Sequence, residues 1–134
     1  TGCKTIPELR TGQVQECCAQ LAALNPKHIV ITSAPNSQRE FSSVAYFAAE
    51  NNFFQEFECN YAPVVFPGAG DCFSAMLLAG ILNGFDLVQS IKGTIAFMQK
   101  AIEISIPVVQ DRKTGIDLVS ALKKDPRFFF SHKE

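Results

Sequence analysis

A short glycine turn that carries one carboxylate is the part of this sequence whose residue types and spacing could do chemistry. The turn consists of Gly68, Ala69, Gly70 and Asp71. Glycine allows backbone angles and close approaches that a Cβ atom would forbid. A helix that begins after such a turn presents unpaired N–H groups and the positive end of its dipole. The pattern therefore predicts a site that holds an anion, and phosphate above all.

Asp71 follows the glycines in what should be the first helical turn. A carboxylate beside a phosphate site repels the bound phosphate, so its presence indicates a task. We predict that Asp71 accepts the proton of a hydroxyl group that attacks a phosphoryl group. The simpler alternative is that Asp71 caps the helix or compensates its dipole. A methyltransferase-type turn is a further alternative, although it would require a third glycine where the chain has Cys72 or Phe73.

Length and composition fit one globular domain or a part of one. The chain has 134 residues, of which 47% are hydrophobic and 19% are charged, and its formal net charge is -1. This charge leaves no electrostatic footprint for a nucleic acid or an anionic membrane. The sequence has no apolar run of roughly 18 residues, as a transmembrane helix needs, and no secretory signal at its start. We therefore expect a cytoplasmic protein that binds neither a nucleic acid nor a membrane.

The five cysteines are expected to be reduced thiols. Their number is odd, Cys17 and Cys18 are adjacent, and no C-x-x-C pair occurs. This pattern fits the cytosol better than a disulfide framework. We expect all five to be buried as small hydrophobic side chains.

The segment at 11–24 predicts an amphipathic helix, because its apolar residues recur at steps of three and four. Thr11 is a candidate N-cap, and Asn25 and Pro26 should end the helix. A strand at 28–32 follows. Its three consecutive β-branched residues indicate burial on both faces, and hence a parallel, central strand.

Thr32 and Ser33 stand at the carboxyl end of that strand. Ligands of open α/β sheets bind at such ends, and the two hydroxyl groups could donate to phosphate or ribose oxygens. The alternative is local hydrogen bonding to the loop at 34–37.

The segments at 43–49 and 53–59 predict a β-hairpin. The pair Asn51-Asn52 between them is a turn signal, because Asn tolerates positive φ. The aromatic residues of its second strand are assigned to the core rather than to a binding surface. A further strand at 62–66 is expected to lead into the glycine turn, with Pro63 at a sheet edge or a strand start.

Three helices are predicted after the glycine turn. The first, at 69–83, is apolar almost all round, so we expect it to be buried in a layered core. The second, at 87–104, should be capped by Asp86, and the third is short, at 117–124. Three adjacent phenylalanines in the tail should dock on the body or on a partner subunit. This order of elements fits a layered α/β architecture.

Three segments, in the correct order, resemble the ribokinase-like kinases, and most of all their pyridoxal kinase branch. The glycine turn followed by Cys72 to Gly80 resembles the signature of that family. Asn25 to Ser33 resembles a strand of the pyridoxal kinase branch, with Asn25 in place of the usual glycine, and Thr1-Gly2 resembles the end of a further segment. The resemblance extends to about Gly115.

Two departures separate this chain from other members of the superfamily. The sugar kinases of the family carry Asp-Thr before the glycine turn, whereas this chain has Phe66-Pro67. Hydroxymethylpyrimidine kinases usually carry Cys at the place of Asp71. Both differences favour a vitamin B6 kinase over a sugar kinase or a pyrimidine kinase.

The resemblance implies a layered α/β/α fold of the ribokinase type. Residues 1–134 would be the C-terminal portion of one kinase domain about twice this length, with the N-terminal half, the metal ligands and the substrate contacts upstream of Thr1. The implied activity is ATP-dependent phosphorylation of the 5′-hydroxymethyl group of pyridoxal, pyridoxine or pyridoxamine. Mg²⁺ and a monovalent cation such as K⁺ are the implied ions. We expect a homodimer or association with the missing half, and no activity from these residues alone.

The resemblance also assigns roles to six residues. Asp71 would deprotonate the hydroxymethyl oxygen, and Thr32 and Ser33 would contact ATP phosphates. The transferring phosphoryl group would be stabilised by the N–H groups of Gly68, Ala69, Gly70 and Asp71. Two alternatives stay open: a ribokinase-like kinase for another small alcohol, and a non-catalytic half-domain that binds nucleotide or nothing.

Overall fold

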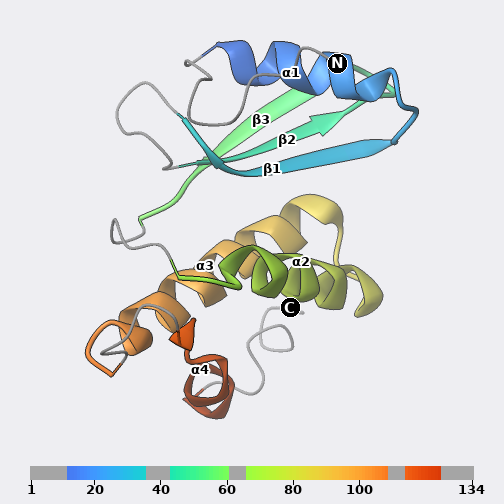
Figure 1. Ribbon diagram of the computed structural model, residues 1–134. Coiled ribbons are helices and arrows are strands. Elements are labelled where there is room, and N and C mark those ends of the chain that lie inside the picture. Colours follow the sequence, from blue (N-terminus) through green and yellow to red (C-terminus); the bar gives the residue numbers. More distant parts are fainter. Residues whose placement is uncertain (1–11, 36–42, 61–65, 109–113, 125–134) are drawn as a thin grey trace. The chain divides into compact units, whose positions relative to one another are not determined.

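The computed structural model describes residues 12–35, 43–60, 66–108 and 114–124. In this part the protein is a mixed α/β structure with a three-stranded antiparallel sheet and four helices (Figure 1). The chain divides into two compact units, Thr1–Asn60 and Tyr61–Glu134. The first unit holds the sheet and one helix, and the second is helical. None of the described helices has the length and apolar character needed to cross a membrane.

The first unit is a sheet with a helix along one face. Its elements are α1 (Gln13–Ala22), β1 (His28–Ala34), β2 (Ser43–Ala48) and β3 (Phe53–Glu58). The strands pair in the order β1-β2-β3, and α1 lies against β1 and β2 (Figure 1). Cys18 of α1 packs with Ile29 of β1 and Phe47 of β2 in one apolar cluster. Burial of such side chains, rather than helix propensity alone, stabilises a helix of this length.

The predicted helix at 11–24 is confirmed with shorter ends. Its N-cap is Gly12, with a φ of 94° and no side-chain cap hydrogen bond, rather than Thr11, which lies outside the described residues. Asn25 has a φ of 69° and donates its N–H to the Ala22 carbonyl at 3.0 Å. The C-cap of α1 is Ala23, so the prediction that Asn25 itself caps the helix is wrong, and Asn25 instead forms the left-handed turn that follows the cap.

The predicted hairpin is also confirmed. β2 and β3 pair antiparallel, and Ala48 pairs with Phe53 across a turn in which Asn52 has a φ of 52°. Asn supplies this positive φ at low cost, which lets the chain reverse. Phe57 is buried, as predicted for a core residue, whereas Phe53 is 42% exposed. The strand predicted at 62–66 lies, up to residue 65, outside the described residues.

The predicted environment of the strand at 28–32 is wrong in the described part of the chain. β1 is antiparallel rather than parallel, and its described strand neighbour is β2 alone. Of its seven residues, Ile29 and Ala34 are buried, whereas all six residues of β2 are buried. A run of β-branched residues indicates a place in a sheet, but it does not identify which strand is central.

The second unit, in its described residues, is built from three helices. They are α2 (Ala69–Leu82), α3 (Leu87–Ser105) and α4 (Leu118–Lys124), and α3 packs against both of the others (Figure 1). The predicted cap of α3 is confirmed, because Asp86 accepts a hydrogen bond from the Gln89 N–H at 2.7 Å. The Gln89 side chain accepts one from the Asp86 N–H at 3.2 Å, which completes a capping box. The phenylalanine tail lies outside the described residues.

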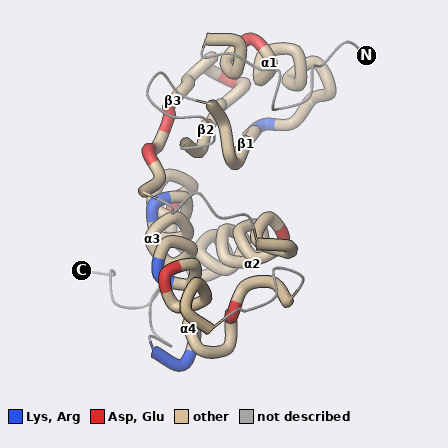
Figure 2. The backbone as a smooth tube through the Cα atoms, turned by 60° about the vertical axis from the view of Figure 1, so that its left-hand side comes forward, with Lys and Arg blue, Asp and Glu red and all other residues tan. Residues whose placement is uncertain are grey.

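The prediction that the helix at 69–83 is buried in a layered core is wrong for one of its sides. α2 buries Cys72, Phe73 and Gly80, but Leu78 is 54% exposed and Leu82 is 76% exposed. A helix buries the side that meets a neighbour, whatever the composition of its other side. α2 also contains no Lys or Arg, which Figure 2 marks in blue on α3 and at the end of α4.

The expected state of the cysteines is confirmed for the four that the structure describes. Cys17, Cys18, Cys59 and Cys72 are buried, and none of these four described residues forms a disulfide. Burial raises the pKa of the Cys18 and Cys72 thiols, because it disfavours the charged thiolate. These side chains therefore act as small hydrophobic groups.

Candidate functional site

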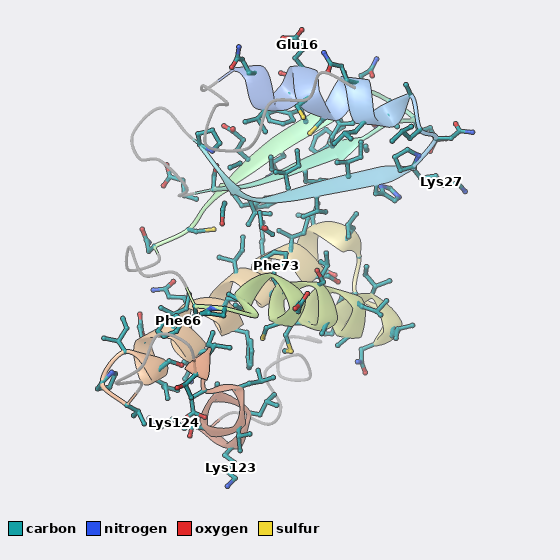
Figure 3. All side chains as sticks on the ribbon, viewed as in Figure 1. Glu16, Lys27, Phe66, Phe73, Lys123 and Lys124 are labelled. Carbon is teal, nitrogen blue, oxygen red and sulfur yellow. The ribbon has the colours of Figure 1, made fainter. Side chains whose placement is uncertain are left out.

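The glycine turn is flanked in sequence by two buried phenylalanines. Phe66 precedes the turn and Phe73 lies near the start of α2, and each is 5% exposed (Figure 3). Gly68 is the N-cap of α2 and has a φ of 81°, a left-handed conformation that favours glycine. The Ala69 N–H donates to the Phe66 carbonyl at 3.2 Å, and the Cys72 N–H donates to the Gly68 carbonyl at 3.0 Å. These contacts fix the backbone of the turn.

Two amides at the start of α2 are open. The N–H groups of Gly70 and Asp71 lie in the first turn, where the helix itself provides no acceptor. Within the described residues neither N–H group makes a hydrogen bond. A Cβ atom placed on Gly70 would meet nothing within 4 Å. The backbone is therefore accessible to a ligand that carries hydrogen-bond acceptors.

Asp71 is exposed beside these amides. α2 has no side-chain cap hydrogen bond, and in the described part of the chain the Asp71 carboxylate has no hydrogen-bond partner. The structure thus gives Asp71 no capping bond, although its place in the first turn suits the helix dipole. An exposed carboxylate without a hydrogen-bond partner can accept a proton from a ligand hydroxyl.

The set of amides open to an anion is smaller than the four predicted from the sequence. Because the Ala69 N–H donates to the Phe66 carbonyl, it is engaged inside the turn. Among the described residues, the N–H groups without a protein acceptor here are those of Gly68, Gly70 and Asp71. The Ala69 N–H is therefore not available to an anion at this turn.

The positive potential at the turn comes from the helix rather than from cationic side chains. The described Lys residues of the second unit lie on α3 and α4, and the described residues there include no Arg (Figure 2). Aligned peptide dipoles place about half an elementary charge at the N-terminus of a helix. Backbone amides and this dipole are the groups that would hold a phosphate at Gly68 to Asp71.

Neither a metal cluster nor a reactive thiol accompanies Asp71 in the described residues. No group of three or more His, Cys, Asp or Glu side chains that could hold a metal ion occurs there. Cys72 follows Asp71 directly, but burial raises the pKa of its thiol, and the thiolate is the nucleophilic form. Asp71 is therefore the one group of this turn suited to proton transfer.

Thr32 and Ser33 lie in the first unit, near the end of β1, and so in a different unit from the glycine turn. Ser33 is exposed with a φ of 55°, and the register of β1 with β2 shifts between Ile31 and Ala34. Among the residues that the structure describes, neither hydroxyl group makes a local hydrogen bond. A left-handed residue other than glycine costs about 1–3 kcal/mol, and such residues cluster at ligand sites.

Two residues contact the turn or its support without a signal in the sequence. A Cβ atom on Gly115 would lie 3.0 Å from the Pro67 carbonyl oxygen. The Ser105 hydroxyl donates to the Ala101 carbonyl at 2.7 Å and accepts the Asp117 N–H at 2.8 Å. The contacts of Gly115 with Pro67 and of Asp117 with Ser105 join positions far apart in the chain, and a lone glycine in a loop or a serine at a helix end does not reveal them.

A comparison with protein families identifies a kinase family. The family model described as phosphomethylpyrimidine kinase matches residues 4–115. A comparison with curated proteins found no match. The matched range includes all six residues that the resemblance assigned to a site.

Solved structures match the chain over most of its length. A candidate phosphomethylpyrimidine kinase from Bacteroides thetaiotaomicron VPI-5482 matches in a rhombohedral form and in an orthorhombic form with pyridoxal. Each match has a TM-score of 0.74 and 24% identity, and covers 84% of this chain. Pyridoxal kinase from Lactobacillus plantarum matches with a TM-score of 0.60 and 19% identity, over 75% of this chain.

The same matches concern part of each solved structure. This chain covers 38% and 40% of the two Bacteroides chains and 37% of the Lactobacillus chain, so it spans about two fifths of their length. At these identities the matches show the fold. The predicted fold class, a partial ribokinase-like α/β kinase fold, is therefore confirmed.

Proposed function

The chain belongs to the phosphomethylpyrimidine kinase family, and from this we propose that it carries the phosphoryl-transfer site of an ATP-dependent kinase for a small alcohol. The observation that supports the proposal is the exposed carboxylate of Asp71 beside the open amides of Gly70 and Asp71. In this arrangement one group can take a proton while its neighbours hold a phosphoryl group.

Asp71 acts as the general base in the proposed reaction. Its carboxylate takes the proton of the substrate hydroxyl while the hydroxyl oxygen attacks the γ-phosphorus of ATP. The bond from the γ-phosphorus to the bridging oxygen breaks, and ADP leaves with that electron pair. The products are a phosphate ester, ADP and protonated Asp71, which returns its proton to water.

The glycine turn stabilises the charge on the transferred phosphoryl group. The N–H groups of Gly68, Gly70 and Asp71 donate to its oxygens, and Ala69 keeps the turn in shape. Donors that are already in place when charge develops supply much of the catalysis in such reactions. ATP fits this site because its terminal phosphate offers acceptors to open amides at a helix N-terminus.

Thr32 and Ser33 are proposed contacts for the phosphates of ATP. The support is that both hydroxyl groups lack a partner among the described residues and that Ser33 is held in a left-handed conformation. Mg²⁺, and a monovalent cation such as K⁺, are the ions we infer for the reaction. No described residue is assigned to either ion.

We propose that the protein acts in the cytoplasm as a homodimer. The substrate we favour is a vitamin B6 alcohol, which is phosphorylated on its 5′-hydroxymethyl group. Two points support it: hydroxymethylpyrimidine kinases usually have Cys where this chain has Asp71, and one matched structure contains pyridoxal. The second candidate is a phosphomethylpyrimidine, after which the family and the Bacteroides protein are named, and there the acceptor would be a phosphate oxygen rather than a hydroxyl group.

The variant Asp71→Asn, made in the full-length protein, tests the proposal. Asn keeps the shape of the side chain and a hydrogen-bond acceptor but loses basicity. We expect kcat to fall by about 10²–10⁴, because that is the usual contribution of a well-placed general base. The measurement is ATP-dependent formation of phosphorylated product from the three B6 alcohols, from a phosphomethylpyrimidine and from a sugar. The 134 residues alone should be inactive.

Glu103→Gln is the matched control for this variant. It neutralises an exposed carboxylate of α3 that accepts a hydrogen bond from Gln99 at 3.2 Å, away from the glycine turn in sequence. It should keep the wild-type rate. Full activity of Asp71→Asn would reject the general base, and a preference for the pyrimidine would reject the B6 substrate. ATP binding without any transfer by the wild type would favour the non-catalytic alternative.

A further inference from the structure

We propose that Gly115 is a positioning residue that sets the orientation of the Gly68 amide, an inference that rests on the function proposed above for the glycine turn. Gly115 precedes α4 and has a φ of 77°. A Cβ atom at this position would lie 3.0 Å from the carbonyl oxygen of Pro67, the residue directly before Gly68. The backbone of Gly115 therefore lies close to the turn, on the side of that oxygen.

Glycine is required at position 115 for two separate reasons. A φ of 77° is a conformation that residues with a Cβ rarely adopt, apart from Asn and Asp. In addition, a Cβ would come closer to a backbone oxygen than packed atoms normally do, and a backbone oxygen cannot turn aside as the end of a flexible side chain can. A side chain at position 115 therefore presses on the Pro67 carbonyl, which must give by a few tenths of an ångström.

The Pro67 carbonyl and the Gly68 N–H belong to one planar peptide unit. In a trans peptide the C=O and N–H bonds point in opposite directions, so the N–H of Gly68 points away from Gly115. Rotation of this unit by pressure on the oxygen would also rotate the N–H. The contact at Gly115 thus determines where one of the three open amides is aimed.

The segment around Gly115 is itself anchored to two helices. The Asp117 N–H donates to the buried Ser105 hydroxyl at 2.8 Å, and that hydroxyl donates to the Ala101 carbonyl of α3 at 2.7 Å. The Asp117 carboxylate accepts the Ser120 N–H of α4 at 3.0 Å. Gly115 therefore presents a fixed surface to the turn, which a positioning role requires.

The variant Gly115→Asn tests the inference, with Gly12→Asn as its matched control. Asn tolerates left-handed φ, so the strain is reduced at both sites and the added Cβ is the main change. Gly12 has a φ of 94° and a Cβ there would meet nothing within 4 Å, whereas the Cβ at Gly115 meets the Pro67 carbonyl. Both variants are made in the full-length protein, and circular dichroism establishes that they are folded.

Two readouts are compared, the amide NMR resonances of Gly68 and Gly70 and the steady-state kinetics. Gly115→Asn should shift the Gly68 resonance and lower kcat by about 10–100-fold with KM nearly unchanged, because misplacing a donor affects the transition state most. Gly12→Asn should leave both readouts at wild-type values. A folded Gly115→Asn protein with an unchanged Gly68 resonance would overturn the inference, whatever its rate.

The NMR readout separates this inference from the proposed function. If the wild type phosphorylates no alcohol, the proposed function fails, while a shifted Gly68 resonance in Gly115→Asn still supports positioning of the turn. If Gly115→Asn does not fold, Ser105→Ala replaces it, because it removes the acceptor of the Asp117 N–H without adding bulk. A Gly68 resonance that is unchanged in Ser105→Ala would then contradict the inference, and a shifted one would support it.

Discussion

The helices α2 and α3 pack against each other, but their first turns are built in opposite ways. At α3, Asp86 and Gln89 exchange two hydrogen bonds. The side chain of each residue accepts the backbone N–H of the other, so both N–H groups at this helix start are satisfied. At α2, the N-cap is Gly68, no side chain caps the helix, and the N–H groups of Gly70 and Asp71 have no acceptor among the described residues. The same chain therefore closes one helix start and leaves the other open.

The difference is small for stability and large for ligand binding. Replacing a good N-cap residue by glycine costs a few tenths of a kcal/mol, because water can reach the exposed amides. The open start of α2 is thus tolerated by the fold. The same amides, together with the helix dipole, form an anion site that a capping side chain would occupy. We infer that a helix start with both an open turn and an exposed acid marks a functional site better than a helix start that is closed by a capping side chain.

Gly68→Asp tests the open start of α2 directly and should have a large effect on this contrast. It places a carboxylate at the start of α2, where two negative groups about 4 Å apart repel by about 4 kcal/mol at an effective dielectric of 20. After screening by salt, we expect kcat/KM for ATP to fall by about 10²-fold. The measurement is the initial rate over a range of ATP concentrations at two ionic strengths.

Gly68→Asn is the matched control, because Asn has the same shape as Asp, tolerates the left-handed φ of 81° and carries no charge. It should lose much less activity than Gly68→Asp, and high salt should narrow the gap between the two variants. Equal losses in both variants would mean that steric change rather than charge governs this position, and would weaken the phosphate site.

Local signals in the sequence predict the helix starts well. The cap of α3 depends on Asp86 and Gln89, and the open start of α2 depends on the two glycines before Asp71. Each set lies within one helical turn, so interactions among a few adjacent residues determine these structures. The same holds for the hairpin, where Asn52 supplies the positive φ of the turn. The cap of α3, the hairpin and the helix of the glycine turn are therefore predictable from the sequence.

Features that depend on distant partners are not predictable in this way. The run Ile29 to Ile31 indicates a strand but not its neighbours, and β2 rather than β1 has every residue buried. The apolar composition of α2 does not tell which side meets α3, so Leu82 is exposed. The engagement of the Ala69 N–H and the approach of Gly115 to the turn arise only once the backbone is folded.

Asp86→Ala should remove the cap of α3 without affecting the open start of α2. It removes the carboxylate that accepts the Gln89 N–H, so the free energy of unfolding should fall by about 1 kcal/mol, the usual value for an N-cap. The rate of phosphoryl transfer should stay near the wild-type value. Chemical denaturation and the kinase assay on the same protein give both quantities.

Asp71→Asn should give the reverse result, a lost rate with a smaller loss of the free energy of unfolding than in Asp86→Ala, because Asp71 makes no hydrogen bond within the described residues and loses only its interaction with the helix dipole. The contrast between the two helix starts would be lost if Asp86→Ala lowered the rate as much as Asp71→Asn does. It would also be lost if Asp71→Asn destabilised the protein by as much as Asp86→Ala.

The start of α4 offers the weakest test, through pH. Asp117 accepts the Ser120 N–H at 3.0 Å, and its pKa is lowered from the ordinary value of 3.8, chiefly by its side-chain and backbone hydrogen bonds with Ser120. A carboxylate whose pKa is lower in the folded state stabilises the fold above the unfolded pKa. This stabilisation is lost as the pH falls from about 3.8 through the folded pKa. Because Asp117 is only partly buried and water screens its carboxylate, the effect should be small.

An NMR titration of the Asp117 carboxyl carbon measures this pKa directly. Ser120→Ala removes the side-chain hydrogen bond, which is the largest cause of the shift, so the pKa should move back toward 3.8. Denaturation between pH 5 and pH 2 should show the corresponding loss of stability in the wild type and a smaller one in the variant. A wild-type pKa at or above 3.8 would mean that the Asp117 carboxylate, like that of Asp71, is not held by a capping hydrogen bond. The position of a carboxylate at a helix start would then not distinguish a cap from a general base.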